Sequence, residues 1–466
     1  MINEKLLAFE SDMKSKNITV IGIGISNLPL IKYLTRLGAK VTACDKRTCD
    51  KLGDTFDELT ALGVELHLGD SYLDNIDGEI IFKTPGMRYD IPELNKAREN
   101  GSIVTSEMEV FFELCPSHII AVTGSDGKTT TTTLIHKMLE KEGYKTWLGG
   151  NIGTPLLTRV CEMEEDDYVV LELSSFQLHT IRKSPEIAVM TNITPNHLDM
   201  HKDYQEYIDA KKNIMLYQNA DNILVANSLN EVTCKISKEA KGKCRCFASS
   251  GDALIHIKDN AIFYDNEEIL KIEEIKVPGK HNVENYMAAI GAVYGLVSID
   301  TILEIAKTFG GVEHRIELVR TLNGVRYYNS SIDSSPNRTI NTLKVFPDKV
   351  IMISGGKDKG ITYDEIGPAI INHVKTLVLI GATSDAIENA LNKAYGDMKI
   401  EPCVNVIRAA TYEEVVSIAR DNAKDGDVVL LSPASTSFDM FNNFEERGNL
   451  FKSIVNSLEE FIERTE

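Results

Sequence analysis

The sequence lacks the features of a secreted, membrane-spanning or disulfide-stapled protein. Its first residues, MINEKLLAFESDMKSK, contain no apolar core of a signal peptide, and no run of about 18 apolar residues could cross a membrane. The 8 cysteines include no CxxC pair and no Cys/His set at zinc spacing. We therefore expect reduced thiols and a cytoplasmic protein.

Positive charge is also scarce. The chain has 50 Lys and Arg against 69 Asp and Glu, a formal net charge of -19. This balance disfavours nucleic-acid partners and membrane insertion or surface binding, and leaves phosphate binding to local loops. The apolar share of 43% and the charged share of 26% are typical of globular proteins. At roughly 150 residues per domain, 466 residues predict about three domains.

No short repeat or low-complexity tract occurs, but a strand followed by a helix recurs along the chain, which predicts an α/β fold with parallel sheets. A β-hairpin is expected within 252–277, around Asp259-Asn260. Three α/β domains are expected at 1–106, 107–311 and 312–466, with Gly310-Gly311 as the second hinge. The predicted strands are 18–24, 39–45, 64–69, 79–86 and 102–107 in the first block, 118–124, 168–175, 187–193 and 222–228 in the second, and 325–331, 350–356, 376–381 and 428–433 in the third.

The strongest motif is the segment Thr123–Thr130, TGSDGKTT, between a predicted strand and a predicted helix. Its glycines let backbone N–H groups converge on an anion, and the helix N-terminus adds partial positive charge. Lys128 can neutralise a β- or γ-phosphate, and the Thr129 hydroxyl can ligate Mg²⁺. Val122 stands where the first glycine of a full P-loop belongs, so the loop is a shortened one. A Gly-rich turn with a surface lysine is the alternative, but the strand–loop–helix context favours nucleotide binding.

A second glycine motif, Gly22-Ile-Gly24-Ile-Ser-Asn27, follows the first predicted strand. A dinucleotide-binding fold would place glycine where Asn27 stands. Two interpretations stay open: a tight turn without a ligand, or a nucleotide-type ligand that also meets Asp45–Arg47 after the next strand.

Polar residues follow further predicted strands of the second block. Glu172, Asn192 and His197 lie at strand ends, and Asn151 lies in GGNIGTP. Ligands of open α/β sheets bind at the carboxyl ends of strands, so a carboxylate and an imidazole there could hold a metal near the P-loop. Each residue alone could be a cap or turn partner, and for a single histidine that role is favoured. The P-loop in the same predicted sheet strengthens the metal interpretation. In the third block, small and polar residues again follow strands, at 313–315, 333–336, 355–360 and 431–438.

Taken together, these segments resemble the Mur ligase family over about residues 18–450, most closely its members that add D-glutamate. The segments are VTGSDGKTTTT, GGNIGTP, ELSSFQL, TNITPNHLD, AKKNI, GKHNVENYMAA, EHRIE, SGGKDKG and LSPASTSFDMFNNFEERG.

The resemblance implies a Rossmann-like N-terminal domain for a UDP-sugar, a central P-loop ATPase-type domain, and a Rossmann-like C-terminal domain for an amino acid. It implies an ATP-dependent ligase of peptidoglycan precursor synthesis that joins D-glutamate to UDP-N-acetylmuramoyl-L-alanine through an acyl phosphate. ATP, two Mg²⁺ ions and a carbamate on Lys211 are the implied cofactors, and a monomer is expected. Competing interpretations are another Mur-type or folylpolyglutamate-type ligase, a nicotinamide-dependent oxidoreductase using Gly22 and Gly24, and a regulatory P-loop protein.

The resemblance also implies residue roles. The implied catalytic residues are Lys128, Glu172, His197, Lys211 and Arg315. The implied ATP-binding residues are Gly124, Ser125, Asp126, Gly127, Lys128, Thr129, Thr130, Asn282, Asn285, Arg315 and Asp333. The UDP-substrate would meet Ser26, Asn27, Asp45, Lys46, Arg47 and Asn151. D-glutamate would meet Lys359, Ser437, Phe438 and Phe444, and the metal ligands would be Thr129, Glu172, His197 and Lys211.

Two positions depart from the family pattern. Asp126 stands in the P-loop where relatives usually have Asn, and Ser335-Pro336 follows Asp333 where many relatives have a lysine.

Overall fold

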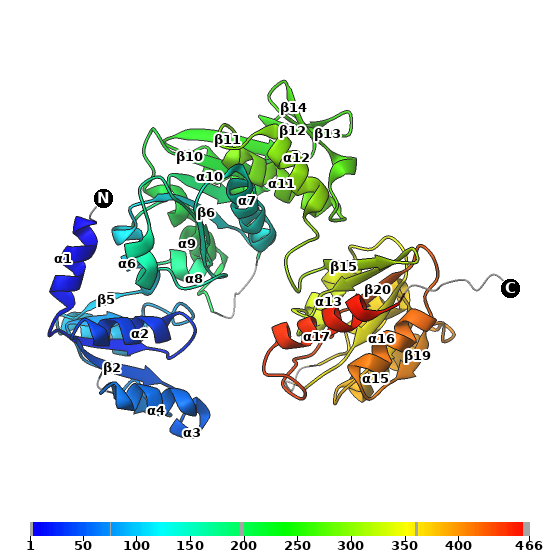
Figure 1. Ribbon diagram of the computed structural model, residues 1–466, viewed down its shortest axis with the longest axis horizontal. Helices are drawn as coiled ribbons and strands as arrows, with labels where there is room; N and C mark the ends of the chain where they lie inside the picture. Colours follow the sequence, from blue (N-terminus) through cyan, green and yellow to red (C-terminus); the bar gives the residue numbers. More distant parts are fainter. Residues whose placement is uncertain (1–2, 75, 196–199, 359–361, 460–466) are drawn as a thin grey trace. The chain divides into compact units, whose positions relative to one another are not determined.

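The computed structural model describes residues 3–74, 76–195, 200–358 and 362–459. The chain divides into two compact units, Met1–Glu274 with His281–Ile305, and Ile275–Lys280 with Ala306–Glu466. The first unit holds two sheets and the second unit holds one (Figure 1). The expected α/β class with parallel-rich sheets is confirmed.

The first sheet is parallel and has the order β3-β2-β1-β4-β5. Apolar runs such as the one in β1 form its strands because both faces of a parallel sheet are covered by helices. All five predicted strands are found, each shorter than its apolar run. The strands are β1 (Asn17–Ile21), β2 (Lys40–Asp45), β3 (Glu65–Leu68), β4 (Ile80–Phe82) and β5 (Ile103–Thr105). The helices are α1 (Glu4–Met13), α2 (Asn27–Arg36), α3 (Cys49–Leu52), α4 (Asp54–Ala61), α5 (Pro92–Glu99) and α6 (Glu107–Leu114).

The second sheet has nine strands in the order β14-β13-β12-β11-β10-β9-β6-β8-β7. Its strands from β7 to β12 pair in parallel, and β12–β14 form an antiparallel extension. The strands are β6 (His118–Thr123), β7 (Thr146–Gly150), β8 (Tyr168–Glu172), β9 (Ile187–Met190), β10 (Ile223–Asn227), β11 (Lys243–Ala248), β12 (Ile255–Lys258), β13 (Ala261–Tyr264) and β14 (Glu267–Lys271).

The hairpin predicted around Asp259-Asn260 is confirmed between β12 and β13. Both turn residues have positive φ, 48° and 59°, as type I′ hairpin turns require. The strands β7 and β11 were not predicted, because glycine-rich TWLGG and polar KCRCFA carry no apolar run.

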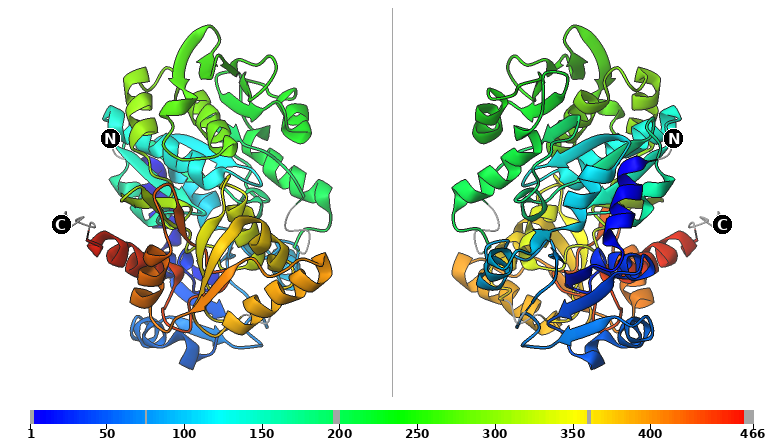
Figure 2. Two further views of the ribbon diagram at one scale, coloured as in Figure 1. Left: turned by 90° about the vertical axis from the view of Figure 1, so that its right-hand side faces the viewer. Right: turned by 90° about the vertical axis from the view of Figure 1, so that its left-hand side faces the viewer.

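Helices surround the second sheet, and α11 and α12 lie together beside its β11–β12 region (Figures 1 and 2). The helical segments are α7 (Lys128–Glu142), α8 (Ser175–Leu178), α9 (Tyr204–Leu216), α10 (Glu231–Ser237), α11 (Lys280–Val293) and α12 (Ile299–Thr308), with the 3-10 turns η1 (Leu157–Glu162) and η2 (Ile272–Glu274).

The third sheet, in the second unit, has the order β15-β16-β20-β17-β18-β19, with only β15 antiparallel. The edge strands β15 and β19 were not predicted, since they are partly exposed and read as polar sequence. The strands are β15 (Glu317–Leu322), β16 (Val325–Asn329), β17 (Val350–Ser354), β18 (Val374–Leu379), β19 (Asn405–Arg408) and β20 (Val428–Leu431). The helices are α13 (Pro336–Leu343), α14 (Ile366–His373), α15 (Ser384–Met398), α16 (Tyr412–Asp421) and α17 (Phe444–Ser457).

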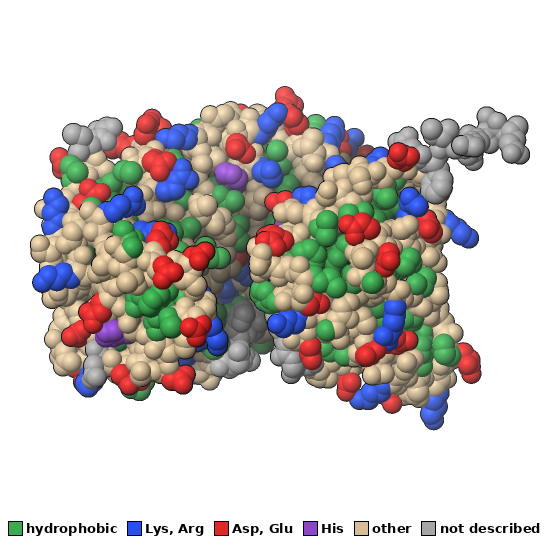
Figure 3. Space-filling view, turned by 60° about the horizontal axis from the view of Figure 1, so that its bottom comes forward, with side chains coloured by type: hydrophobic (Ala, Val, Ile, Leu, Met, Phe, Trp, Pro, Cys, Tyr) green, Lys and Arg blue, Asp and Glu red, His purple; other side chains and the backbone are tan. Residues whose placement is uncertain are grey.

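The described residues include no helix long and apolar enough to cross a membrane. Acidic and basic side chains are interspersed on the face shown in Figure 3.

Candidate functional site

The P-loop motif forms the connection between β6 and α7, as the sequence predicts. Gly127 has a φ of +77°, and a Cβ added there would lie 2.3 Å from Oδ1 of Asn285. At Gly124, φ is +157° and an added Cβ would collide with the Thr191 hydroxyl. Close approach of neighbouring atoms therefore requires glycine at both positions.

The segment after β9 holds this loop from the side. The backbone N–H of Ser125 donates to the Asn192 carbonyl at 2.8 Å, and the N–H of Asp126 donates to Asn192 Oδ1 at 3.0 Å. The Thr191 hydroxyl donates to the Asp126 carbonyl at 2.6 Å. The Asp126 side chain is exposed, so the loop is fixed through the backbone of this residue. Thr191 was not singled out from the sequence, because a threonine after a strand carries no motif.

Lys128 is the first residue of α7, and its Nζ donates to the Ser125 carbonyl at 2.9 Å. Thr129 is buried and Thr130 is half-buried beside it in the first turn. An ammonium group, the N–H groups of the first helical turn and a hydroxyl thus gather at one helix N-terminus, the arrangement that binds phosphate.

Glu172 ends β8, directly beside β6, and pairs in register with Val122. Its Oε1 accepts a hydrogen bond from Asn151 Nδ2 at 2.8 Å. Its Oε2 is buried and has no hydrogen-bond partner among the described residues. A buried carboxylate oxygen with open lone pairs, one strand from the P-loop, suits a hard cation such as Mg²⁺.

Lys211, on α9, is buried beneath the P-loop. Its Nζ donates to the Gly124 carbonyl at 2.8 Å and to the Thr123 hydroxyl at 3.3 Å. Burial and the nearby Lys128 hold the pKa of Lys211 well below its ordinary value. Lys212 turns the other way and pairs with Glu239 at 2.5 Å. Of the two adjacent lysines, only Lys211 reaches the loop in this structure.

Asn282 and Asn285 lie one turn apart on α11. Asn285 Nδ2 donates to Asn282 Oδ1 at 3.1 Å, and the Thr131 hydroxyl donates to Asn285 Oδ1 at 3.4 Å. Asn285 therefore joins α11 to the P-loop helix, although it lies 154 residues from Thr131 in sequence.

The turn after β1 is organised by Asp45, at the end of β2. Its Oδ2 accepts the N–H of Ile23 at 2.7 Å, and Arg47 donates to both of its carboxylate oxygens. Burial alone would raise the pKa of Asp45, but the hydrogen bonds from Arg47 and Ile23 outweigh it and lower the pKa to about 2. Asn27 is buried and donates to the Ile21 carbonyl at 2.9 Å. Ser26 is half-buried and Lys46 is exposed.

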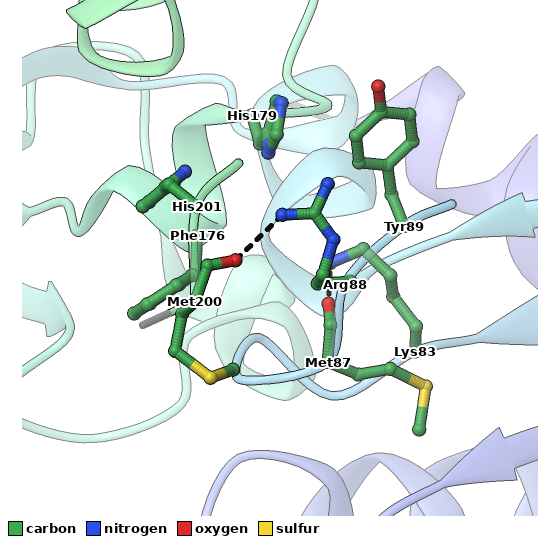
Figure 4. A pocket seen from close by; sticks show the side chains of 8 residues that line it. All are labelled: Lys83, Met87, Arg88, Tyr89, Phe176, His179, Met200 and His201. Carbon is green, nitrogen blue, oxygen red and sulfur yellow. Dashed lines mark hydrogen bonds between the residues drawn. The ribbon is translucent and has the colours of Figure 1, made fainter. Parts of the chain in front are cut away.

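A small pocket opens within the first unit, between the segment after β4 and the segment before α9 (Figure 4). Arg88 points into it and donates to the Met200 carbonyl at 2.6 Å. The same guanidinium donates to both carboxylate oxygens of Glu206, on α9, and to Asp90. This cluster was not predicted from the sequence, because Arg88 lies in no motif and its partner Glu206 is 118 residues away. The pocket is lined by Lys83, Met87, Arg88, Tyr89, Phe176, His179, Met200 and His201.

In the second unit, the buried Asp333 accepts a hydrogen bond from the Ser432 hydroxyl at 2.8 Å, and burial raises its pKa. Arg447 is fully buried and donates to Ser331 and to the Ser435 carbonyl, so it ties together the ends of β16 and β20. The sequence did not single out Arg447, although it belongs to the quoted FEERG segment.

The remaining predicted residues of the second unit differ in exposure. Arg315 is half-buried, and its N–H donates to the Val312 carbonyl at 2.9 Å. Ser437 is buried, Phe438 is 59% exposed, and Phe444 begins α17.

His197 and Lys359 lie outside the described residues. Within the described part of the chain, no group of three or more His, Cys, Asp or Glu side chains is placed to hold a metal.

The sheet order and the loop after β6 define a nucleotide-binding α/β protein of the P-loop class, with a second α/β unit after it. Three family descriptions match the sequence: "Mur ligase MurD-like, N-terminal domain" over 16–106, "Mur ligase middle domain" over 122–293, and "Mur ligase, glutamate ligase domain" over 314–435. The chain belongs to the Mur ligase family, whose members are ATP-dependent amide-bond-forming ligases that use Mg²⁺.

Relatives named as ligases match over nearly their whole lengths. The UDP-N-acetylmuramoylalanine--D-glutamate ligase of Ruminiclostridium cellulolyticum is 55% identical over 98% of this chain and 100% of the relative. The enzyme of the same name from Clostridium perfringens is 49% identical over 97% of this chain and 98% of the relative.

Solved structures share the fold at low identity. The UDP-N-acetylmuramate-alanine ligase MurC of Thermotoga maritima has a TM-score of 0.59 at 19% identity, covering 95% of this chain and 99% of that one. MurF from Acinetobacter baumannii has a TM-score of 0.55 at 14% identity, covering 96% of this chain and 92% of that one.

Proposed function

We propose that this chain is the ATP-dependent ligase that adds D-glutamate to UDP-N-acetylmuramoyl-L-alanine in peptidoglycan precursor synthesis. The observation that carries the proposal is the site around the P-loop, where Lys128, Glu172 and Lys211 meet at the carboxyl ends of β6 and β8. The 55% identity to a relative named for this reaction supports the choice of acceptor.

The chemistry begins with transfer of the γ-phosphate of ATP to the terminal carboxylate of the UDP-substrate. The amine of D-glutamate attacks the resulting acyl phosphate, and phosphate leaves as the amide forms. The γ-phosphate and the substrate carboxylate are both negatively charged and repel each other. Lys128 and the N-terminus of α7 offset this negative charge. The buried Lys211 donates to the Thr123 hydroxyl and to the Gly124 carbonyl, so it supports the loop that offsets this charge.

Two Mg²⁺ sites complete the proposal. Glu172 and Thr129 would hold one ion, and His197 and a carbamylated Lys211 would hold the other. The open oxygen of Glu172 fits the first role. When bound, Mg²⁺ supplies positive charge that polarises the phosphate oxygens.

A carbamate on Lys211 is consistent with the amine's surroundings. Burial and the nearby Lys128 lower the pKa of Lys211, and this shift enlarges the neutral share of the amine. A neutral amine adds CO₂ to give a carbamate and releases one proton, which turns a nitrogen donor into an oxygen ligand that suits Mg²⁺.

Other residues are assigned by role. Asn282 and Asn285 are assigned to contact the adenine of ATP. Asp333 is assigned to the ribose, and Arg315 to the γ-phosphate. Asn151, Ser26, Asn27, Asp45, Lys46 and Arg47 meet the UDP-substrate, and Lys359, Ser437, Phe438 and Phe444 meet D-glutamate. The cytoplasm, where ATP and UDP-sugars are available, is the proposed location, and a monomer is the proposed state.

Phosphate release from ATP tests the function. We expect release only when both UDP-N-acetylmuramoyl-L-alanine and D-glutamate are present, in a scan across amino acids. Release with a different amino acid would overturn the acceptor, and release that ignores amino acids would overturn the ligase reaction.

Lys211→Ala, with Lys212→Ala as the matched control, tests the carbamate. We expect Lys211→Ala to be nearly inactive and partly rescued by acetate, while Lys212→Ala stays active. In ¹³C-bicarbonate, a carbamate NMR signal should appear in the parent protein and in Lys212→Ala and be missing from Lys211→Ala. A signal that survives in Lys211→Ala would contradict the assignment even if activity were lost.

A further inference from the structure

Two cysteines on one strand of the second sheet lie in contact. Cys244 and Cys246 are two residues apart on β11, so their side chains point to the same face. Their Sγ atoms are 3.3 Å apart. Cys244 is exposed and Cys246 is half-buried.

At these two residues the strand pairs with a neighbour on one side only. On one side, β10 pairs with the whole of Lys243–Phe247, but on the other side β12 pairs only with Phe247 and Ala248. The backbone around the two thiols therefore has room to adjust. Residues two apart on an extended strand have Cα atoms about 6.6–6.8 Å apart, at the upper end of the range that a disulfide spans.

Neighbouring groups favour a reactive thiolate. Ser237, the last residue of α10, lies near the two thiols and lowers the pKa of both. The contact between the two thiols lowers the pKa of Cys246 to about 6 and raises the pKa of Cys244. By contrast, burial raises the pKa of Cys44 to about 12 and that of Cys115 to about 11. Reactive cysteines are the partly exposed ones with thiolate character.

We propose that Cys244 and Cys246 form a redox modification site that reacts with low-molecular-weight disulfides and closes to a disulfide within β11. In the first step the Cys246 thiolate attacks one sulfur of the small disulfide, forms a mixed disulfide and releases one small thiolate. In the second step the Cys244 thiol loses its proton and attacks Cys246 Sγ, which releases the second small thiol. Two electrons pass from the protein dithiol to the small disulfide, which leaves as two thiols.

The site is separate from the nucleotide site. Two strands, β10 and β9, lie between β11 and β6, which leads into the P-loop. The inference does not rest on the proposed ligase reaction, and the variants used to test it lie outside the proposed catalytic and binding residues.

Oxidised glutathione is the probe, applied to the full-length protein and to Cys244→Ser and Cys246→Ser. Trypsin cuts after Lys243 and after Arg245, so reduced chain yields the dipeptide Cys244-Arg245 and the peptide 246–258. Oxidised chain should yield these two peptides joined, two hydrogens lighter than their sum and without glutathione. Cys403, which is exposed and lies in the second unit, is the internal control.

The single variants separate the two steps. In Cys244→Ser the second step is blocked, so one glutathione should remain on Cys246, and in Cys246→Ser no joined peptide should form. Unfolding curves of the variants that match the parent show that the fold is kept. The inference is overturned if Cys244 and Cys246 stay reduced under conditions that modify Cys403. It is equally overturned if mixed disulfides accumulate in the parent chain without the joined peptide.

Discussion

Replacing Arg88 by Ala removes the cation that joins the segment after β4 to helix α9. The guanidinium donates to Glu206 at 3.0 Å through each of two nitrogens, to Asp90 at 2.8 and 2.9 Å, and to the Met200 carbonyl. The side chains of Arg88, Asp90 and Glu206 are 24%, 22% and 14% exposed, so the two carboxylates would lose a partner that is largely shielded from water.

The magnitude follows from the pKa of Glu206. Hydrogen bonds from Arg88 lower it from 4.5 to about 2, a shift equivalent to about 3 kcal/mol. Solvent at the edge of the cluster and the remaining partner Lys202 reduce this, so we expect Arg88→Ala to lower the free energy of unfolding by roughly 1–2 kcal/mol. With a slope near 3 kcal/mol per M, the urea midpoint should fall by about 0.5 M.

The effect should depend on pH with a definite sign. Since the folded-state pKa of Glu206 is depressed, the stabilisation is complete above about pH 4.5 and is lost as the pH falls toward 2. Near pH 3.5, roughly 60% of the neutral-pH difference between the two proteins should remain. His179, 4.0 Å from Glu206, gains charge on acidification and attracts the same carboxylate, which reduces the difference further.

Urea unfolding followed by the fluorescence of Trp147 measures this change. The chain has 1 tryptophan, and it is buried in the first unit, so the signal reports that unit. Lys141→Ala is the matched control, because Lys141 pairs with Glu304 at 2.7 Å with both side chains about half exposed. That control should change stability by less than about 0.5 kcal/mol. Equal midpoints for the two variants at pH 7, or a difference that grows on acidification, would refute the reasoning.

Three further changes test other parts of the chain. Gly127→Ala places an alanine in a left-handed backbone conformation with its Cβ against Asn285, so ATP affinity should fall about 5- to 30-fold in a binding titration. The control Gly143→Ala has the same backbone strain but open space around the added Cβ, so it should leave ATP affinity unchanged. Lys128→Ala should lose ATP-dependent phosphate release while its unfolding curve stays intact, and near-normal turnover would contradict the P-loop assignment. Burial raises the pKa of Glu107 to about 7, so the free energy of unfolding of the wild-type chain should fall by about 3 kcal/mol, relative to that of Glu107→Gln, as the pH rises from 4.5 to 7. A difference in stability that does not change with pH would contradict the raised pKa of Glu107.

The sequence by itself determined the elements whose signal is local. The parallel strands are buried on both faces, so apolar runs such as those of β6 and β17 could be found without their neighbours. The turn at Asp259-Asn260 could also be predicted from the sequence, because Asp and Asn tolerate positive φ. The P-loop could be predicted because the residues that suit phosphate binding are the eight consecutive residues Thr123–Thr130, between a predicted strand and a predicted helix.

Edge and polar strands could not be found in this way. In β11, β15 and β19 the backbone pairs with a neighbour while the side chains stay partly in water, so no apolar run marks them. Their pairing is decided by strands that fold elsewhere in the sequence.

The environment of each site residue was decided only by the tertiary structure. Only the family resemblance favoured Lys211 over the adjacent Lys212, whereas the fold buries Lys211 beneath the P-loop and pairs Lys212 with Glu239. The contact between Arg88 and Glu206 likewise spans 118 residues. Burial and long-range partners set the charge state and orientation of such groups, and both come into being only when distant segments pack together.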